Sequence, residues 1–176
     1  MSLSTDLLGT LSPEKKIFVA YSGGLDSTAL LFLCNKALKQ KKISNLKAIH
    51  INHNLSKNSD NWQQHCESFC RSNNIEFESF IVEVSKNRSS IESQARQARY
   101  KIFESLLDTN DQILLAHHRD DVFETLLLRL FRGTGVDGLS GLSEKRSLGK
   151  GEILRPFLNS PKSDLKIYID ENELAY

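Results

Sequence analysis

The segment Ser22-Gly-Gly-Leu-Asp-Ser27 has the residue types and the spacing of a phosphate-binding turn. The apolar residues 17–21 before it predict a strand buried on both faces, and the apolar periodicity after Ser27 predicts a helix. Adjacent glycines let the chain turn tightly between the two, so that backbone N–H groups converge at the positive end of the helix dipole. Such a cradle binds phosphate, and we expect the whole segment to form it: Ser22, Gly23, Gly24, Leu25, Asp26 and Ser27.

The glycine pattern narrows the kind of phosphate site. It lacks the lysine of a Walker P-loop and the third glycine of the dinucleotide fingerprint G-x-G-x-x-G. The segment SGGLDS instead resembles the pyrophosphate loop of the N-type ATP pyrophosphatases, and this resemblance implies ATP as the cofactor. In that superfamily the loop holds the β- and γ-phosphates, while the α-phosphate is transferred as AMP. The alternative is an ordinary Gly-Gly turn with Ser27 near a helix cap.

A second group of reactive side chains follows the apolar stretch 111–116. It combines two histidines with three acids: His117, His118, Asp120, Asp121 and Glu124. A polyphosphate site needs Mg²⁺, which prefers carboxylate oxygens, and we expect Asp26 and Asp120 to bind the ion. Acids at the start of a helix also compensate its dipole, which is worth about 0.3–1 kcal/mol. That alternative accounts for one acid, but not for three acids beside two histidines.

Polar side chains also end the predicted strand 46–52. Strand alternation places His50 and Asn52 on one side, where we expect them to contact the cofactor. On the predicted helix 90–108, Arg96 and Arg99 follow Glu92 at i+4 and i+7. They form either an intrahelical ion pair with a spare arginine or a surface that faces polyphosphate or RNA.

The stretch 132–142 is rich in glycine and predicts an irregular loop. A loop that closes over a substrate needs this backbone freedom, and so does a plain surface linker. On the first interpretation, the residues that contact the substrate are Arg132, Gly133, Thr134 and Gly135.

Strand and helix patterns alternate from residue 17 to residue 131, which predicts an α/β fold with a mostly parallel sheet flanked by helices. The expected strands are 17–21, 46–52, 75–84, 111–116 and 152–156, and the expected helices are 27–38, 60–73, 90–108, 121–131 and 163–173. The apolar residues of the helix 121–131 are expected to pack: Val122, Phe123, Leu126, Leu127, Leu130 and Phe131. Ligands of such sheets bind beyond the carboxyl ends of the strands. The three chemically rich segments all follow strand ends, so we expect one shared site.

Composition limits the class of protein. The net charge of +1 provides no broad basic field for nucleic acid, and no apolar stretch approaches the roughly 18 residues of a membrane span. The chain has three cysteines, an odd and sparse number that indicates a reducing, cytoplasmic location. We expect a polar lead-in over 1–16, a catalytic domain over 17–160 and the start of a helical extension over 161–176.

The helix expected over 60–73 carries Trp62, Cys66, Phe69 and Cys70 at helical spacing. This periodicity predicts a packed face rather than a metal site that uses His65 and the two thiols. Cys34 lies on the apolar stripe of the first predicted helix and is expected to be a core residue.

These segments together resemble the catalytic domain of the tRNA(Ile)-lysidine synthetase family, which has an adenine nucleotide alpha hydrolase-like fold. Beside SGGLDS, the matching motifs are His50-x-Asn52-His53, Glu92-x-x-Ala95-Arg96-x-x-Arg99-Tyr100, HH-x-DD-x-x-ET over 117–125, RGTG over 132–135 and Arg155-Pro156. They span roughly residues 17–158 in the family's order. SGGLDS marks only the superfamily, whereas the histidine–acid motif followed by RGTG is much more specific.

The resemblance implies a two-step ligation. ATP first adenylates the C2 carbonyl oxygen of the wobble cytidine in an isoleucine tRNA with a CAU anticodon, and the ε-amine of L-lysine then attacks C2 and displaces AMP. The amine must be held and must lose a proton, for which the candidates are Asp120, Asp121, Glu124, His117 and His118. Full-length members continue into further tRNA-binding domains, which we expect to be absent from this chain.

Two other functions compete with this interpretation. The first is a tRNA cytidine 2-thiolation enzyme of the same superfamily, which carries C-x-x-C pairs, whereas this chain has Cys66-x-x-x-Cys70 on an apolar helix face. The second is a sensor that binds nucleotide without turnover, against which the histidine–acid motif argues.

Overall fold

The computed structural model describes residues 3–54, 58–82, 91–131, 133 and 142–176. Its centre is a six-stranded sheet with the order β3-β2-β1-β4-β6-β5. The strands are β1 (Ile17–Ala20), β2 (Lys47–Asn52), β3 (Glu76–Ile81), β4 (Gln112–Leu114), β5 (Lys145–Leu148) and β6 (Gly151–Leu154). All neighbouring strands pair in parallel except β5, which runs antiparallel to β6 at the edge. The predicted α/β class with a mostly parallel sheet is confirmed.

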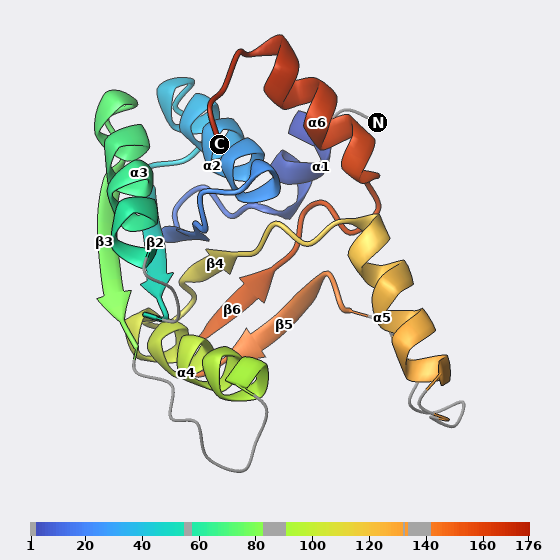
Figure 1. Ribbon diagram of the computed structural model, residues 1–176. Coiled ribbons are helices and arrows are strands. Elements are labelled where there is room, and N and C mark those ends of the chain that lie inside the picture. Colours follow the sequence, from blue (N-terminus) through green and yellow to red (C-terminus); the bar gives the residue numbers. More distant parts are fainter. Residues whose placement is uncertain (1–2, 55–57, 83–90, 132, 134–141) are drawn as a thin grey trace.

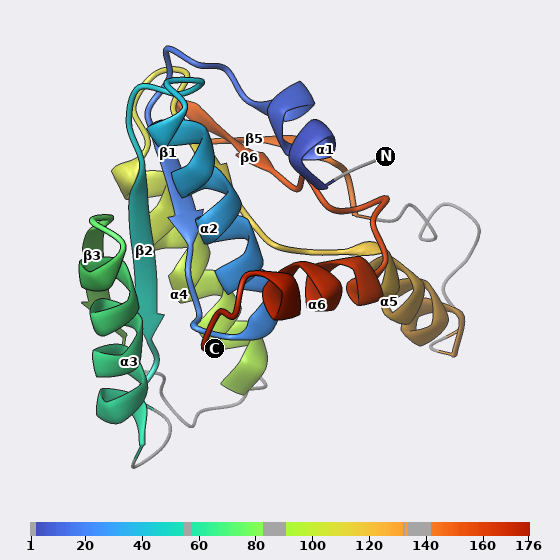
Figure 2. The same ribbon diagram turned by 90° about the horizontal axis from the view of Figure 1, so that it is seen from above.

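Helices cover both faces of the sheet (Figures 1 and 2). One face carries α1 (Leu3–Thr10), α2 (Leu25–Lys39), α3 (Ser59–Ser72) and α6 (Lys162–Glu171), and the other carries α4 (Ile91–Leu106). An apolar core lies on each face of the sheet, because successive side chains of a strand point to opposite faces. Ile17 and Val19 of β1 pack with α1, α2, α3 and α6, whereas Phe18 packs with Phe103 of α4.

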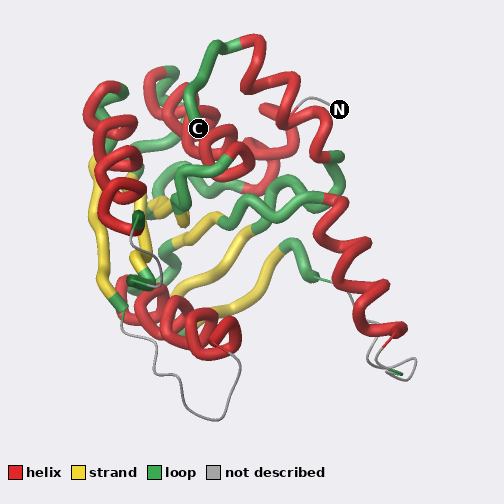
Figure 3. Tube along the Cα trace, in the orientation of Figure 1, coloured by secondary structure: helices red, strands yellow, loops and turns green. Residues whose placement is uncertain are grey.

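The helix α5 (Arg119–Phe131) differs from the others because it projects away from the sheet (Figures 1 and 3). We expected its apolar residues to pack into the core, but none of them is buried. Phe123 is 64% exposed and Phe131 is 85% exposed, while Val122 and Leu126 are half-buried. The sequence prediction of the helix is confirmed, and the prediction of its burial is wrong.

The two ends of the chain pack into the same core. A helix, α1, lies where we expected only a polar lead-in, and its Leu3 and Leu7 are buried beside α2. At the other end, Leu165 and Ile169 of α6 belong to that core too. Lys36 joins α2 to α6, because its ammonium group lies over the Tyr168 ring and donates a hydrogen bond to Asn172 at the end of α6.

No helix in the described part of the chain is long and apolar enough to span a membrane.

Candidate active site

A cavity of about 690 Å³ opens at the carboxyl ends of β1, β2 and β4. The chain proceeds from β1 to β2 on one side and returns to β4 on the other, so this is the point where strand order reverses, the usual ligand site of such sheets. The lining joins the three segments expected to share a site. Its polar members include Ser22, Gly24, Asp26, Ser27, His50, Asn52, His53, Trp62, Arg99, His117 and Asp121.

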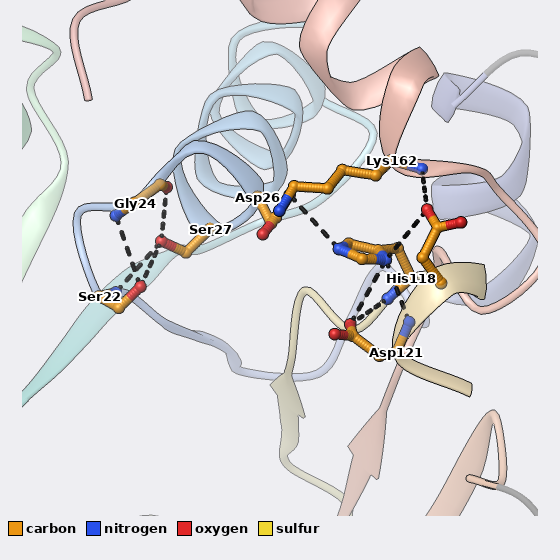
Figure 4. Close-up of polar contacts among 8 residues, drawn as sticks. Ser22, Gly24, Asp26, Ser27, His118, Asp121 and Lys162 are labelled. Atoms are coloured by element: carbon orange, nitrogen blue, oxygen red, sulfur yellow. Dashed lines mark hydrogen bonds and ion pairs between the residues drawn. The ribbon is translucent and has the colours of Figure 1, made fainter. Parts of the chain in front are cut away.

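The turn between β1 and α2 has the geometry of an anion cradle. Gly23 has φ +81°, a left-handed conformation that favours glycine. The Ser27 hydroxyl donates to the Gly24 carbonyl at 3.0 Å and accepts the Ser22 N–H at 3.2 Å, which closes the turn (Figure 4). No side chain caps α2, so the N–H groups of its first turn stay available to a ligand.

His118 lies at the centre of three carboxylates (Figure 4). Its Nε2 is 3.7 Å from Asp26 Oδ1, and its Nδ1 is 3.6 Å from one oxygen each of Asp120 and Asp121. The backbone joins α5 to this cluster, because the His118 N–H donates to Asp121 at 2.8 Å and the Asp121 N–H is 3.4 Å from Nδ1. An Nδ1 that accepts a hydrogen bond leaves the ring proton on Nε2, which faces Asp26. His118 is buried and does not line the cavity.

Asp26 suits a cation. Its Oδ1 is buried and has no hydrogen-bond partner among the described residues. Those residues contain no group of three or more His, Cys, Asp or Glu side chains placed to hold a metal ion. Mg²⁺ often uses one or two carboxylates and completes its coordination with phosphate oxygens and water, so the orphan oxygen of Asp26 fits it. Asp120 is on the opposite side of the His118 ring, where it accepts the Lys162 N–H at 2.7 Å.

His117 lines the cavity in a positive environment. Burial lowers its pKa to about 4, with Arg155, Arg96 and Arg99 adding to the decrease and Asp121 opposing it. Arg155 is only 2% exposed and donates to the Ser143 carbonyl at 2.7 Å. Arg99 lines the cavity, whereas Arg96 is exposed and lies over the Tyr100 ring. This wall of the cavity therefore favours an anionic ligand.

The β2 end supplies neutral polar groups. His50 Nδ1 is 2.9 Å from the Tyr21 carbonyl, so that nitrogen carries the proton and Nε2 can accept. Burial lowers the pKa of His50, which keeps the ring neutral at pH 7. Asn52 donates to Gln63 at 3.0 Å and accepts the Asn54 N–H. Both side chains line the cavity, and so do Ile49 and Ile51 of the same strand.

The chain matches a known protein family and several curated relatives. The PP-loop domain matches residues 3–176. The chain belongs to the PP-loop family. Among curated PP-loop relatives, tRNA(Ile)-lysidine synthase of Legionella pneumophila (strain Lens) is 45% identical over 99% of this chain. The same-named proteins of Coxiella burnetii and Pseudomonas syringae pv. tomato are 43% and 42% identical over 95% and 99% of it. The chain spans only about 40% of the length of these relatives.

Solved structures share the PP-loop fold. The U34-tRNA thiolase NcsA from Methanococcus maripaludis aligns with 99% of this chain and 63% of its own, with a TM-score of 0.75 and 21% sequence identity. An FMN adenylyltransferase of Candida glabrata aligns with 95% of this chain and 54% of its own, with a TM-score of 0.57 and 16% identity. At these identities the likeness shows the fold alone.

The PP-loop site does not bring all predicted residues together. Glu124 is exposed on α5 and Arg96 is exposed on α4, and neither lines the cavity. Gly133 follows α5 with φ +68°. The other residues expected to close over the substrate, Arg132, Thr134 and Gly135, lie outside the described residues.

Two residues of the PP-loop site have a place that sequence reasoning missed. Trp62, expected on a packed face, is 46% exposed and lines the cavity. The sequence shows Arg155 only as part of the motif Arg155-Pro156. In the structure it is a buried cation beside His117. The packed face is otherwise confirmed, since Cys66 and Cys70 are buried, and Cys34 is a core residue as predicted.

Proposed function

We propose that this chain catalyses ATP-dependent ligation of L-lysine to C2 of the wobble cytidine in an isoleucine tRNA with a CAU anticodon. The observation that carries the proposal is 42–45% identity, over nearly the whole chain, to proteins named tRNA(Ile)-lysidine synthase. The cavity supports it, because residues of the turn 22–27 line it together with His117 and Asp121. A tRNA substrate and free thiols fit a cytoplasmic location.

In the first step the turn 22–27 binds the β- and γ-phosphates of ATP. Its open N–H groups face charge that increases on the departing pyrophosphate, so they stabilise the transition state more than the ground state. Asp26, and on the prediction also Asp120, would hold Mg²⁺, which would supply positive charge to the leaving pyrophosphate. His50 and Asn52 present a neutral wall for the rest of the nucleotide.

In the second step the lysine amine must be held near C2 and deprotonated. Of the five candidates, His117 and Asp121 line the cavity, which favours them over Glu124. The low pKa of His117 keeps it neutral, so we assign attraction of the ammonium group to Asp121, and the proton passes to one of these two side chains. Arg99 and Arg96 bind the anionic parts of the substrates.

The test measures release of pyrophosphate and AMP from ATP by the product of the complete gene, with an isoleucine tRNA transcript and with or without lysine. We expect pyrophosphate when tRNA is present and AMP only after lysine is added. Asp26→Asn should lower turnover at least about 100-fold, the order expected when a transition-state charge contact is lost. Asp170→Asn, on the exposed part of α6, is the matched control.

Two outcomes would contradict the proposal. Turnover that ignores lysine and responds to a sulfur donor would indicate a thiolation enzyme. Burial argues against that function, because it raises the pKa of both Cys66 and Cys70 to about 12 and keeps these thiols unreactive. Nucleotide binding without any turnover would indicate a sensor.

A further inference from the structure

Trp62 contacts the phosphate loop directly from another element. Its indole N–H, on α3, donates to the Ser22 carbonyl at 2.5 Å. The ring is 46% exposed and lies against His65, with 5.4 Å between ring centroids and 24° between planes. Neither burial nor core packing explains this placement, so the hydrogen bond to the loop needs another reason.

The bond determines how the first peptide of the loop is oriented. The C=O of Ser22 and the N–H of Gly23 belong to one trans peptide plane and point in opposite directions. A carbonyl fixed toward Trp62 therefore directs the Gly23 N–H to the opposite side of the peptide plane, away from the indole. Gly23 has φ +81° and no side chain to hold this plane by itself, so the orientation depends on an outside contact.

α3 is a rigid support for that contact. A Cβ atom on Gly23 would come within 2.7 Å of Cys66 Sγ and 3.2 Å of Trp62 Nε1, so the helix packs tightly against the loop. Cys66 and Cys70 anchor α3 in the core. The indole is thus fixed on one side by a helix whose two cysteines are buried in the core and on the other by the loop carbonyl.

We propose that Trp62 is a positioning residue that holds the phosphate loop in its ligand-binding conformation through the Ser22 carbonyl. The inference rests on the proposed function only in that the loop's ligand is the polyphosphate of ATP. Trp62 acts through Gly23 and touches none of the reacting atoms. Its contribution is therefore specific to ligands that carry β- and γ-phosphates.

The first test compares ATP with AMP. Trp62→Phe keeps an aromatic ring but removes the N–H donor, and we expect the Kd for ATP to increase about five- to ten-fold, as for loss of one neutral hydrogen bond. The Kd for AMP should stay unchanged, because AMP lacks the phosphates that the loop holds. Gln64→Ala, an exposed change on the same helix, should alter neither value.

The second test needs no variant. Trp62 is the only tryptophan of the 176 residues, so its emission reports on the loop. We expect ATP and pyrophosphate to shift the emission, and adenosine to leave it unchanged. This measurement keeps the proposal falsifiable if Trp62→Phe does not fold.

The possible failures are distinguishable. Equal weakening of ATP and AMP by Trp62→Phe would mean a general structural role and would overturn the inference. Unchanged ATP affinity, or an emission that ignores pyrophosphate, would overturn it while leaving the ligase function intact. A wild-type protein that binds no ATP would overturn both proposals.

Discussion

The helices α2 and α5 both begin at the cavity and both carry site acids in their first turn, yet they are held in different ways. α2 buries much of its length, including Leu30, Leu31 and Cys34, between the sheet and α6. α5 buries no residue, and hydrogen bonds join its beginning to His118. The phosphate half of the site is therefore held by packing, and the acidic half by polar contacts.

This difference shows that one active site can combine a rigid part with a part whose position depends on charge. Packing fixes the Asp26 side of the site whatever the pH, because apolar contacts do not titrate. Asp120 and Asp121 are held instead by hydrogen bonds that their own ionisable carboxylates accept from the backbone N–H groups of Lys162 and His118. Variants that change packing and polar contacts separately test this difference between α2 and α5.

The largest effect should come from truncating α2. Leu30 is fully buried, and Leu30→Ala should lower the free energy of unfolding by about 2–5 kcal/mol, because a cavity remains where the side chain was. The matched change Leu128→Ala, on the exposed face of α5, should change it by less than about 0.5 kcal/mol. Urea denaturation of both variants measures the difference.

Equal losses of stability in the two variants would contradict the difference between α2 and α5. They would mean that the apolar face of α5 is covered in solution. A loss in Leu30→Ala alone would support packing as the force that holds α2.

The same contrast explains which features the sequence could predict. The order of strands and helices was predictable because each buried strand and each half-buried helix leaves its own apolar period. β5 was missed because Lys145-Arg-Ser-Leu148 is an exposed edge strand without such a period. α1 was missed because its short sequence offers only Leu3 and Leu7 as buried residues.

The burial of α5 was mispredicted for a related reason. A sequence shows that a helix is apolar, but not whether another element lies opposite it. The location of the site was predictable, since polar residues at strand ends meet at one sheet edge. The contact of Trp62 with the loop was not, because a tryptophan on an amphipathic helix has the same pattern whether it packs inward or reaches a carbonyl.

A pH-dependent effect should come from His117, at the corner before α5. Its pKa is about 4 in the folded protein against an ordinary 6.5, because burial and nearby arginines disfavour the cation. Above pH 6.5 the group is neutral in both states. As pH decreases from 6.5 toward 4 the unfolded chain binds a proton that the folded protein does not, so stability decreases.

His117→Gln should remove this part of the slope, which cannot exceed about 1.4 kcal/mol per pH unit for one proton. Denaturation curves between pH 4 and pH 7 measure it in both proteins. Identical slopes would show that the corner before α5 is not held by a buried neutral histidine.

The smallest effect should come from the contact between α5 and α6. Asp120 accepts the Lys162 N–H at 2.7 Å, at the start of a helix that has no side-chain cap of its own. Asp120→Ala should therefore cost about 0.5–2 kcal/mol, as for loss of a helix cap, and Asp120→Asn should cost less because it keeps an acceptor. Asp170→Asn, farther along α6, is the control.

Amide hydrogen exchange distinguishes this effect from a general loss of stability. The Lys162 N–H should exchange faster in Asp120→Ala, while the amides of Leu165 and Ile169, which lie in the core, keep their protection. Because α6 packs on α2, the contact links the polar half of the site to the packed half. Unchanged exchange at Lys162 would show that α5 and α6 are independent, and that packing alone determines where α6 begins.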